Sequence, residues 1–399
     1  MTPTLRVAHV IPSVSARTGG PAVSVLQLSV ALSALGVKTE IFTTDLASAA
    51  SAPTLARLGD TELNDLRRKT VINVAPARTP LRFAYAPSLR KELDRRNMDF
   101  DVIHIHGLYL YPQYAAYRIA RTRKLPYVIS IRGILDRYMR SRNRLRKAIV
   151  DVTWQHAMLR KAAAIHVTST AECDATSDSA PRVPRAIVPN PVDWRAYVDL
   201  PDKRVFIDRF LGGGLPHVVM YLGRVSHKKG LPVLIAAFAQ VAPSHPDAIL
   251  AIVGPDDEGL LPELRSLAAS LGVSSKSRFV DYVSGPEKLA ALASATVWVL
   301  PSMTENFGVA VVEALAAGVP VILSEGVAIG AELAAAGACV VCAATPAALA
   351  VEIASLLEDQ LRRESLSRAA RLAAQRFSPE TVAEQMLKVY RTIAMTKIG

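Results

Sequence analysis

"PSMTENFGVAVVEALAAG", residues 301–318, is the stretch that predicts the fold of its region most directly. The β-branched and aromatic run "TVWVL" before it (296–300) and the run "VPVIL" after it (319–323) are typical of buried strands. Gly318, with a proline two residues later, predicts the end of a helix, because glycine is a common C-cap and proline cannot continue a helix. The stretch therefore predicts a strand, a loop, a helix that begins near Gly308 and a second strand.

Two glutamates, Glu305 and Glu313, interrupt this apolar stretch eight residues apart. Glu305 lies in the predicted loop, and Glu313 lies about a turn and a half inside the predicted helix. A helix N-terminus has unpaired N–H groups and partial positive charge, which suit a phosphate. The two carboxylates can accept hydrogen bonds from the hydroxyls of a ribose or a sugar. The alternative is structural, with Glu305 capping the helix and Glu313 on its solvated face.

Strands alternate with helical patterns along the chain, which predicts parallel, doubly wound sheets. The turn-rich segment "IVPNPVDW" (187–194) separates two such series, and an amphipathic helix at 377–394 with Ser378 as its cap closes the second. We therefore predict an α/β chain of two Rossmann-like domains facing a cleft, with ligands at the carboxyl ends of the strands. The predicted strands cover residues 5–13, 38–44, 70–75, 101–107, 126–132 and 164–169 in the first half, and 217–223, 248–254, 277–283, 296–300 and 319–323 in the second.

The composition indicates a globular protein with more than one domain, since the chain has 399 residues, of which 50% are hydrophobic and 21% charged. No apolar run reaches the roughly 18 residues of a membrane span, and the first residues lack the pattern of a signal peptide. Three cysteines fit a reducing compartment. Two of them, Cys339 and Cys342, lie in a predicted strand on opposite faces, which favours a structural role. We expect a cytoplasmic protein.

The excess positive charge lies in the first half of the chain. Residues 1–200 carry 29 Lys and Arg against 16 Asp and Glu, whereas residues 201–399 carry 18 against 19. The charge is densest in "DRYMRSRNRLRKAIV" (136–150), where apolar side chains are interleaved. Such a segment fits an interfacial helix at an anionic membrane or a lipid-phosphate acceptor, and it also fits a solvated face. Because no nucleic-acid motif accompanies it, we expect no nucleic-acid partner.

A glycine-bounded loop, "GRVSHKKG" (223–230), follows the first predicted strand of the second half. Arg224 supplies a bidentate fork and Lys229 a point charge, a pairing that suits a diphosphate. Surface decoration is the alternative, but the Glu305–Glu313 unit in the same domain favours a site. Neither half has G-x-G-x-x-G at a strand–helix turn or the P-loop motif, which argues against dinucleotide dehydrogenases and P-loop kinases.

"GRVSHKKG" together with "ENFGVAVVE" (305–313), an E-x7-E motif, resembles the retaining glycosyltransferases of family four, which have the GT-B fold. The resemblance extends over nearly the whole chain. It implies an N-terminal acceptor-binding domain at 1–192, a C-terminal nucleotide-sugar-binding domain at 193–376, and a last helix at 377–399 that crosses back to the N-terminal domain. The other matching segments are the Gly19–Gly20 loop, "DVIHIHG" (101–107), "VPNPVD" (188–193) and "VGPDDEG" (253–259).

The resemblance also implies roles for individual residues. Glu313 would bind the ribose hydroxyls and Glu305 those of the transferred sugar, while Arg224 and Lys229 would neutralise the leaving diphosphate. His106 would face the sugar from the other side of the cleft. The implied catalytic residues are His106, Arg224, Lys229 and Glu305, and the implied substrate-binding residues are Gly19, Gly20, Arg132, Gly223, Asn306, Phe307, Gly308, Val309 and Glu313.

Two local features bear on mechanism. The D-x-D of "DFD" (99–101) precedes a strand and reads as a turn, so we predict no metal and no cofactor, the positive side chains taking the place of a cation. No protein nucleophile is evident, and the family's usual proposal is a front-face route in which a donor phosphate oxygen takes the acceptor proton. The sequence departs from the family at 131–143, where Arg132 stands near a position that is histidine in many members.

We therefore expect a retaining, metal-independent hexosyltransferase. It would move a hexose from a GDP- or UDP-sugar to a glycan or lipid-linked acceptor in the biosynthesis of a surface polysaccharide, such as lipopolysaccharide or exopolysaccharide, at the inner face of the cytoplasmic membrane. The first alternative is a nucleotide-sugar epimerase of the same architecture. The second is a basic lipid- or nucleic-acid-binding protein without catalysis. The nucleotide base is left open, because backbone near 280–283 would read it.

Overall fold

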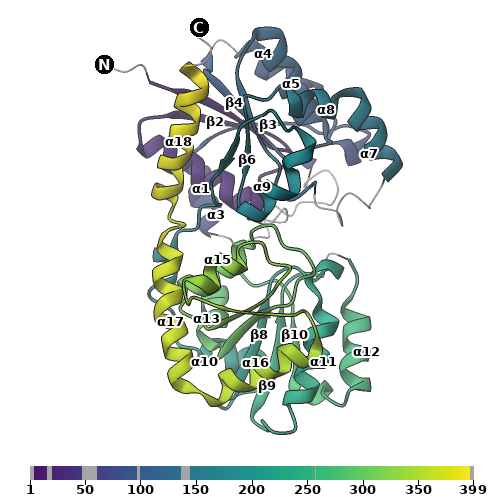
Figure 1. The fold of residues 1–399 in the computed structure, drawn as a ribbon, viewed down its shortest axis with the longest axis vertical. Coiled ribbons are helices and arrows are strands. Elements are labelled where there is room, and N and C mark those ends of the chain that lie inside the picture. The colour runs from purple at the N-terminus through teal and green to yellow at the C-terminus, as the bar shows by residue number, and fades with distance from the viewer. Residues whose placement is uncertain are drawn as a thin grey trace. The chain divides into compact units, whose positions relative to one another are not determined.

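The computed structural model describes residues 4–15, 20–46, 61–96, 99–135, 144–256 and 258–395. The chain divides into two compact units, each with its own parallel sheet (Figure 1). The N-terminal unit comprises Met1–Pro191 and Pro379–Gly399, and the C-terminal unit comprises Val192–Ser378. The predicted fold class, two Rossmann-like doubly wound domains, is confirmed, and the predicted cleft between them stays a prediction.

The N-terminal unit has a seven-stranded sheet in the order β3-β2-β1-β4-β5-β6-β7, and its paired strands run parallel. Each predicted strand of the first half is present, and among the described residues of this unit the sequence missed only β7, which has three residues and shows no period to detect. The strands are β1 (Arg6–Val10), β2 (Lys38–Thr44), β3 (Val71–Ala75), β4 (Val102–His106), β5 (Tyr127–Ser130), β6 (Ala164–Val167) and β7 (Arg185–Ile187).

Helices cover this sheet, and the last helix of the chain is one of them. Helix α18 packs against α1 (Figure 1), and it places Val382, Met386 and Tyr390 in the same core cluster as Val7 of β1. The C-terminal helix is therefore part of the N-terminal unit. The helices of the unit are α1 (Gly20–Ala34), α3 (Thr61–Arg68), α4 (Pro87–Arg95), α5 (Tyr111–Arg123), α7 (Arg144–Val150), α8 (His156–Arg160), α9 (Thr170–Thr176) and α18 (Pro379–Met395).

The C-terminal unit has a six-stranded parallel sheet in the order β10-β9-β8-β11-β12-β13. Its strands are β8 (His217–Leu222), β9 (Ala248–Val253), β10 (Ser277–Val280), β11 (Val297–Leu300), β12 (Val321–Ser324) and β13 (Val340–Cys342). Its helices are α10 (Arg204–Phe206), α11 (Leu231–Val241), α12 (Leu261–Ser270), α13 (Gly285–Ser294), α14 (Val309–Ala316), α15 (Gly330–Ala335), α16 (Pro346–Glu358) and α17 (Gln360–Gln375).

The stretch at 301–318 folds as its sequence predicts. Strand β11 precedes it, α14 begins directly after Gly308, and β12 follows. Gly308 and Gly318 both have left-handed backbones, with φ of 76° and 73°, which glycine adopts at little cost. Helix α14 is apolar nearly all round because it contacts both β12 and α17. Glu313 is therefore a carboxylate on a helix that is otherwise core.

The strand order reverses at the same place in both units. The reversal lies between β1 and β4 in the N-terminal unit and between β8 and β11 in the C-terminal unit. In doubly wound sheets, ligands bind outside the carboxyl ends of the strands at this switch point. Strand β8 leads directly to Arg224, and β11 leads to Glu305. The two predicted motifs of the C-terminal unit thus meet at its switch point.

Candidate functional site

The loop after β8 is held against the loop after β11 by close backbone contact. A Cβ atom at Gly230 would lie 2.2 Å from the carbonyl oxygen of Pro301, so only glycine fits there. The backbone N–H of Met303 donates to the carbonyl of Lys228 at 2.9 Å. The first loop is also anchored by the Tyr221 hydroxyl, which donates to the Arg224 carbonyl at 2.7 Å. The two loops therefore form one fixed structure at the switch point.

Glu305 lies among positive side chains. Lys229 forms an ion pair with its carboxylate, and the Lys228 ammonium lies 3.6 Å from the same oxygen. The Glu305 and Lys229 side chains are only 12% and 14% exposed. Burial alone would raise the pKa of the Glu305 carboxyl, but the two lysines outweigh it and hold the pKa below its ordinary value. Glu305 is therefore an ionised carboxylate, which can only accept hydrogen bonds.

Positive charge exceeds negative charge in this cluster. Burial lowers the pKa of Lys229 in spite of its pairing with Glu305, and the nearby cations Lys228 and Arg224 act in the same direction. Arg224 is itself exposed. A group of cations that repel one another around a single carboxylate is suited to a further anion. Arg224 and Lys229 are thus close enough for their charges to act on each other, and their predicted binding of one shared anion stays a prediction.

The backbone of Glu305 is fixed on both sides. Its N–H donates to the Gly326 carbonyl, and its own carbonyl accepts from the Ala328 N–H, both at 2.9 Å. A Cβ atom at Gly326 would lie 2.4 Å from the carbonyl oxygen of Ser302, so this approach also requires glycine. The carboxylate is thus held by the rigid backbone of neighbouring loops, as a binding group must be.

Glu313 pairs with a lysine that the sequence did not single out. The Lys288 ammonium, on α13, lies 3.2 Å from the Glu313 carboxylate and donates to the Tyr197 hydroxyl at 3.1 Å. The Glu313 side chain is largely buried, so the alternative of a solvated helix face is wrong. Lys288 is 25 residues away in the chain, and only the folded sheet brings it close.

The segment between the two glutamates begins as a loop whose Phe307 side chain lies in the core. The Phe307 ring is buried and packs edge-on against Phe377, with ring centroids 5.5 Å apart. A Cβ atom at Gly308 would lie 2.9 Å from Val311, so the turn into α14 requires glycine. Asn306, Val309 and Gly223 are half-buried at the same place. The predicted role of this segment, through its N–H groups, is compatible with that arrangement.

In the N-terminal unit, the predicted residues lie beside a buried histidine group. Arg132 follows β5 and donates to Asn190 at 3.2 Å, and its guanidinium lies 3.1 Å from Nδ1 of His106. His106 is buried, and its Nε2 lies 3.0 Å from Nδ1 of His9. Its predicted contact with a sugar stays a prediction, since its ring nitrogens contact protein groups here. Gly20 is the first residue of α1, and Gly19 lies outside the described residues.

Sequence reasoning missed most of this group. The sequence does not single out His9, His166, Ser130 or Tyr390, although hydrogen bonds connect these side chains with His104 and His106. A signal was present, because four of the eight histidines of the chain lie in predicted strands of the first half. Their chain positions alone do not show that the side chains meet.

The D-x-D at 99–101 and the cysteine pair occupy structural positions. Asp101 accepts from the Arg6 backbone at 2.9 Å and pairs with its guanidinium at 3.1 Å, and Asp99 pairs with Arg96. Cys339 and Cys342 are free thiols, and burial raises their pKa values to about 12 and about 11. Such thiols are protonated and inert at neutral pH. The interpretation of the cysteine pair as structural fits these environments.

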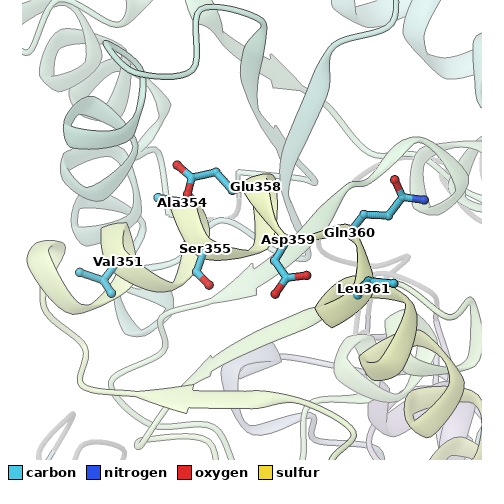
Figure 2. A pocket seen from close by; sticks show the side chains of 7 residues that line it. All are labelled: Val351, Ala354, Ser355, Glu358, Asp359, Gln360 and Leu361. Carbon is cyan, nitrogen blue, oxygen red and sulfur yellow. The ribbon is translucent and has the colours of Figure 1, made fainter.

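An open hollow at the junction of α16 and α17 does not suit an anionic ligand (Figure 2). Its lining includes two carboxylates, Glu358 and Asp359, and no basic side chain. Neither of the motif loops contributes to it. It is lined by Val351, Ala354, Ser355, Glu358, Asp359, Gln360 and Leu361.

The basic segment at 136–150 lies partly outside the described residues, which resume at Arg144. Helix α7 and the π-helical turn after it expose two large apolar side chains, Ile149 at 65% and Val152 at 82%. Within the ranges that the structure describes, none of the helices has the length and apolar character needed to cross a membrane.

Both halves of the chain match domains of glycosyltransferases. Residues 19–191 match the glycosyl transferase 4-like domain, and residues 213–373 match glycosyl transferases group 1. Together with the two doubly wound sheets, these matches support a GT-B glycosyltransferase of the family 4 type.

Individual proteins with similar sequences are also glycosyltransferases by name. A phosphatidyl-myo-inositol mannosyltransferase of Mycolicibacterium smegmatis is 34% identical over 211 residues, which is 52% of each chain. A D-inositol 3-phosphate glycosyltransferase of Corynebacterium urealyticum is 32% identical over 185 residues, or 44% of this chain and 43% of that one. The chain spans about half the length of the curated relatives it matches.

Among solved structures, Anabaena HepE in complex with UDP and glucose has a similar fold, with a TM-score of 0.77. The alignment covers 97% of this chain and 100% of HepE at 19% identity. At that identity the likeness concerns the fold alone.

Proposed function

We propose that the protein is a retaining glycosyltransferase that moves a hexose from a nucleotide diphosphate sugar to a glycan or lipid-linked acceptor. The observation that carries the proposal is the Glu305 cluster, in which a buried carboxylate stands among Lys229, Lys228 and Arg224 at the switch point of the C-terminal unit. The two domain matches add support, because both are glycosyltransferase domains.

The cluster supplies what the departure of a nucleoside diphosphate requires. As the glycosidic bond breaks, negative charge develops on the leaving diphosphate, and preorganised cations stabilise that charge. Arg224 and Lys229 fill this role in the proposal, with Lys228 as a third cation that the sequence did not reveal. Side-chain cations in this number do the work that a metal ion does in other enzymes, so the proposal includes no metal.

The two glutamates bind the neutral parts of the donor in this proposal. Glu305 is ionised and fixed by its backbone contacts, so it accepts hydrogen bonds from hydroxyls of the transferred sugar. Glu313 accepts one hydrogen bond from Lys288, and a carboxylate has room for more, which suits the two ribose hydroxyls. The donor then lies across the N-terminus of α14, whose N–H groups and dipole favour the diphosphate.

The N-terminal unit binds the acceptor in the proposal, and the basic segment brings it to a membrane. Ile149 and Val152 are exposed on α7 and its following turn, close in sequence to the exposed Arg146. Exposed apolar side chains among basic ones suit the interface of an anionic membrane. The mannosyltransferase relative is named for a phosphatidylinositol acceptor, which makes lipid-linked acceptors the first ones to test, with surface polysaccharide assembly as the proposed setting.

The test is release of nucleoside diphosphate from GDP- and UDP-sugars, with and without lipid extracts as acceptor. We expect release that depends on acceptor and is lost in Glu305→Gln, with Glu263→Gln, an exposed glutamate on α12, as the matched control. Analysis of the product anomer checks retention. Conversion of the donor without acceptor would indicate an epimerase, and no turnover of any nucleotide sugar would contradict the proposal.

A further inference from the structure

The N-terminal unit contains a cluster of four buried histidines, His9, His104, His106 and His166. The sheet register brings them together. His9 of β1 lies opposite His104 of β4, and Ser130 of β5 lies between His106 of β4 and His166 of β6. Partners in a parallel sheet point to one face, as do residues two apart on one strand. All five side chains therefore lie on the face that receives Tyr390 of α18.

The hydrogen bonds of this cluster form two chains. In the first chain, the donor and the acceptor of every hydrogen bond can be assigned. His166 Nε2 lies 2.7 Å from the Val188 carbonyl, which can only accept, so this nitrogen carries the proton. Neutral His166 then accepts at Nδ1 from the Ser130 hydroxyl, which accepts in turn from His104 Nε2, both at 2.6 Å. His104 Nδ1 is left to accept from the Tyr390 hydroxyl at 2.6 Å.

A second chain runs from Arg132. Its guanidinium can only donate, so His106 accepts at Nδ1, over 3.1 Å, and carries its proton on Nε2. That proton is donated to His9 Nδ1 over 3.0 Å, which leaves His9 protonated on Nε2. Among the described residues, His9 Nε2 has no hydrogen-bond partner. The two chains touch where the His104 and His106 rings lie 4.0 Å apart.

A metal ion does not fit this cluster, although ring nitrogens of His9, His104 and His106 lie within 4.8 Å of one another. Both nitrogens of His104 and both of His106 are already in hydrogen bonds. The charged Arg132 lies against His106 and would repel a cation. None of these hydrogen bonds involves a carboxylate. The cluster is therefore a neutral network rather than a ligand set.

Both chains end on the same short segment before the boundary between the units. His166 donates to Val188, and Arg132 donates to Asn190, while the chain enters the C-terminal unit after Pro191. Arg132 also has a left-handed backbone, with φ of 56°, which is strained for a residue with a Cβ atom. Such strain persists only where the surroundings hold it, and it is common at functional sites.

We propose that the two hydrogen-bonded chains are a positioning device for Arg132, with Tyr390 and Ser130 as positioning residues and with every histidine neutral and protonated on Nε2. Burial agrees with this, since it lowers the pKa of all four imidazoles. Half-buried Arg132 then presents a fixed cation to an anionic group of the acceptor, a step that rests on the proposed function.

The test compares Tyr390→Phe with Tyr127→Phe. Tyr127 is the matched control, because it is another buried tyrosine of the same unit and donates to the Met158 carbonyl at 2.8 Å. In protein labelled with 15N-histidine and with the signals assigned, we expect the four network histidines of the wild type all to be in the Nε2–H form at pH 7. Tyr390→Phe should shift the Nδ1 signal of His104 and should disturb His106, whereas Tyr127→Phe should leave both unchanged.

Kinetics provide the second measurement. Tyr390→Phe should lower kcat or raise the acceptor KM by about tenfold, as misplacement of a binding group does, while diphosphate affinity stays within about twofold. Loss of activity no larger than in Tyr127→Phe, or an Nδ1–H tautomer at any of the four network histidines in the wild type, would overturn the proposal. If the wild type binds no nucleoside diphosphate at all, the proposed function fails, and the tautomer measurement still decides on the network.

Discussion

The two switch points of this protein occupy the same place in two similar sheets but contain opposite chemistry. In the C-terminal unit, Glu305 forms ion pairs with Lys228 and Lys229, Arg224 adds positive charge near Lys229, and the cations outnumber the carboxylate. In the N-terminal unit, neutral imidazoles form hydrogen bonds with one another and with neutral hydroxyls beside the cation Arg132. The fold fixes where a site lies, and the residues within and after each strand decide whether it attracts an anion or positions a side chain.

The difference is also one of energetics. In the charged cluster, removal of one partner leaves a buried charge without compensation, which typically costs about 3–5 kcal/mol. In the neutral network, loss of one hydrogen bond leaves an unpaired polar group, at about 1–3 kcal/mol. Substitutions in the C-terminal cluster should therefore have larger effects than substitutions in the N-terminal network.

The largest expected effect is that of Lys229→Met. It removes the cation that lies against Glu305 and leaves that carboxylate with Lys228 alone. We expect transfer to fall by about 100- to 1000-fold, in line with removal of a preorganised group that stabilises the leaving charge. Lys203→Met, at an exposed lysine of the same unit, is the control. Equal activity of the two variants would show that the cluster does not act on the donor.

Gly230→Ala should have the next largest effect. The new Cβ atom would lie 2.2 Å from the Pro301 carbonyl oxygen, and φ is 67°. We expect the free energy of unfolding to fall by about 2–4 kcal/mol and diphosphate binding to weaken with it. At Gly272 φ is 73° but no atom lies within 4 Å of the Cβ position, so Gly272→Ala should lose only about 1 kcal/mol. Chemical denaturation of both variants measures the difference.

The fold of the stretch at 301–318 could be predicted because its signals are local. Alternating apolar runs, a glycine at the start of α14 and Gly318 at its end all lie within about twenty residues, and each has a direct physical meaning. Glu305 and Lys229 could be placed in one site in advance because both follow predicted strands of the same domain, but the ion pair between them was not predicted. The three-residue strand β7 gave no comparable signal.

The rest of the site depends on contacts between distant parts of the chain. Lys288 reaches Glu313 from α13, and Tyr390 reaches His104 across 286 residues of sequence. The position of α18 on the N-terminal sheet brings Tyr390 there, and only the finished sheet register aligns His106, Ser130 and His166. Tautomers follow from these contacts, so sequence alone could not predict a neutral network.

The two switch points should lose their contributions to folding stability at different pH values. The histidines of the network have pKa values below 6.5 in the folded protein, about 3 for His9 and about 4 for His166, because burial and the charge of Arg132 oppose protonation. Below about pH 6.5 the unfolded chain binds more protons, so stability is lost as the pH falls from 6.5 toward 4.

The expected slope is up to about 1.4 kcal/mol per pH unit for each histidine. Among the described residues, Arg132 and its neighbour Glu172 are the charged groups near the network, and the titratable hydroxyl of Tyr390 stays neutral because burial raises its pKa. The pKa of Glu305 lies below its usual value, so its contribution to stability is lost only at lower pH. Hydrogen exchange of amides in β4 and β5 between pH 7 and pH 5 measures the effect, and unchanged protection would contradict the network.

The smallest expected effect concerns the exposed face of α7 and its following turn. Ile149→Asp with Val152→Asp removes two exposed apolar side chains and adds negative charge. We expect binding to vesicles containing anionic lipid to weaken about tenfold, while folding and diphosphate binding stay unchanged. Leu361→Asp with Leu372→Asp, at exposed positions of the C-terminal unit, is the control. Equal loss of vesicle binding in both variants would show that this face does not bind the membrane.

The most direct test of the proposed nucleotide-sugar site is calorimetric titration with UDP, GDP and ADP without added metal. Wild type, Glu313→Ala and the control Glu263→Ala would be compared at the same ionic strength. We expect the wild type and the control to bind one of the three diphosphates selectively, and Glu313→Ala to bind it at least about tenfold more weakly, a loss of about 1.4 kcal/mol. Failure of the wild type to bind any diphosphate, or equal binding by Glu313→Ala, would contradict a nucleotide-sugar site in the C-terminal unit.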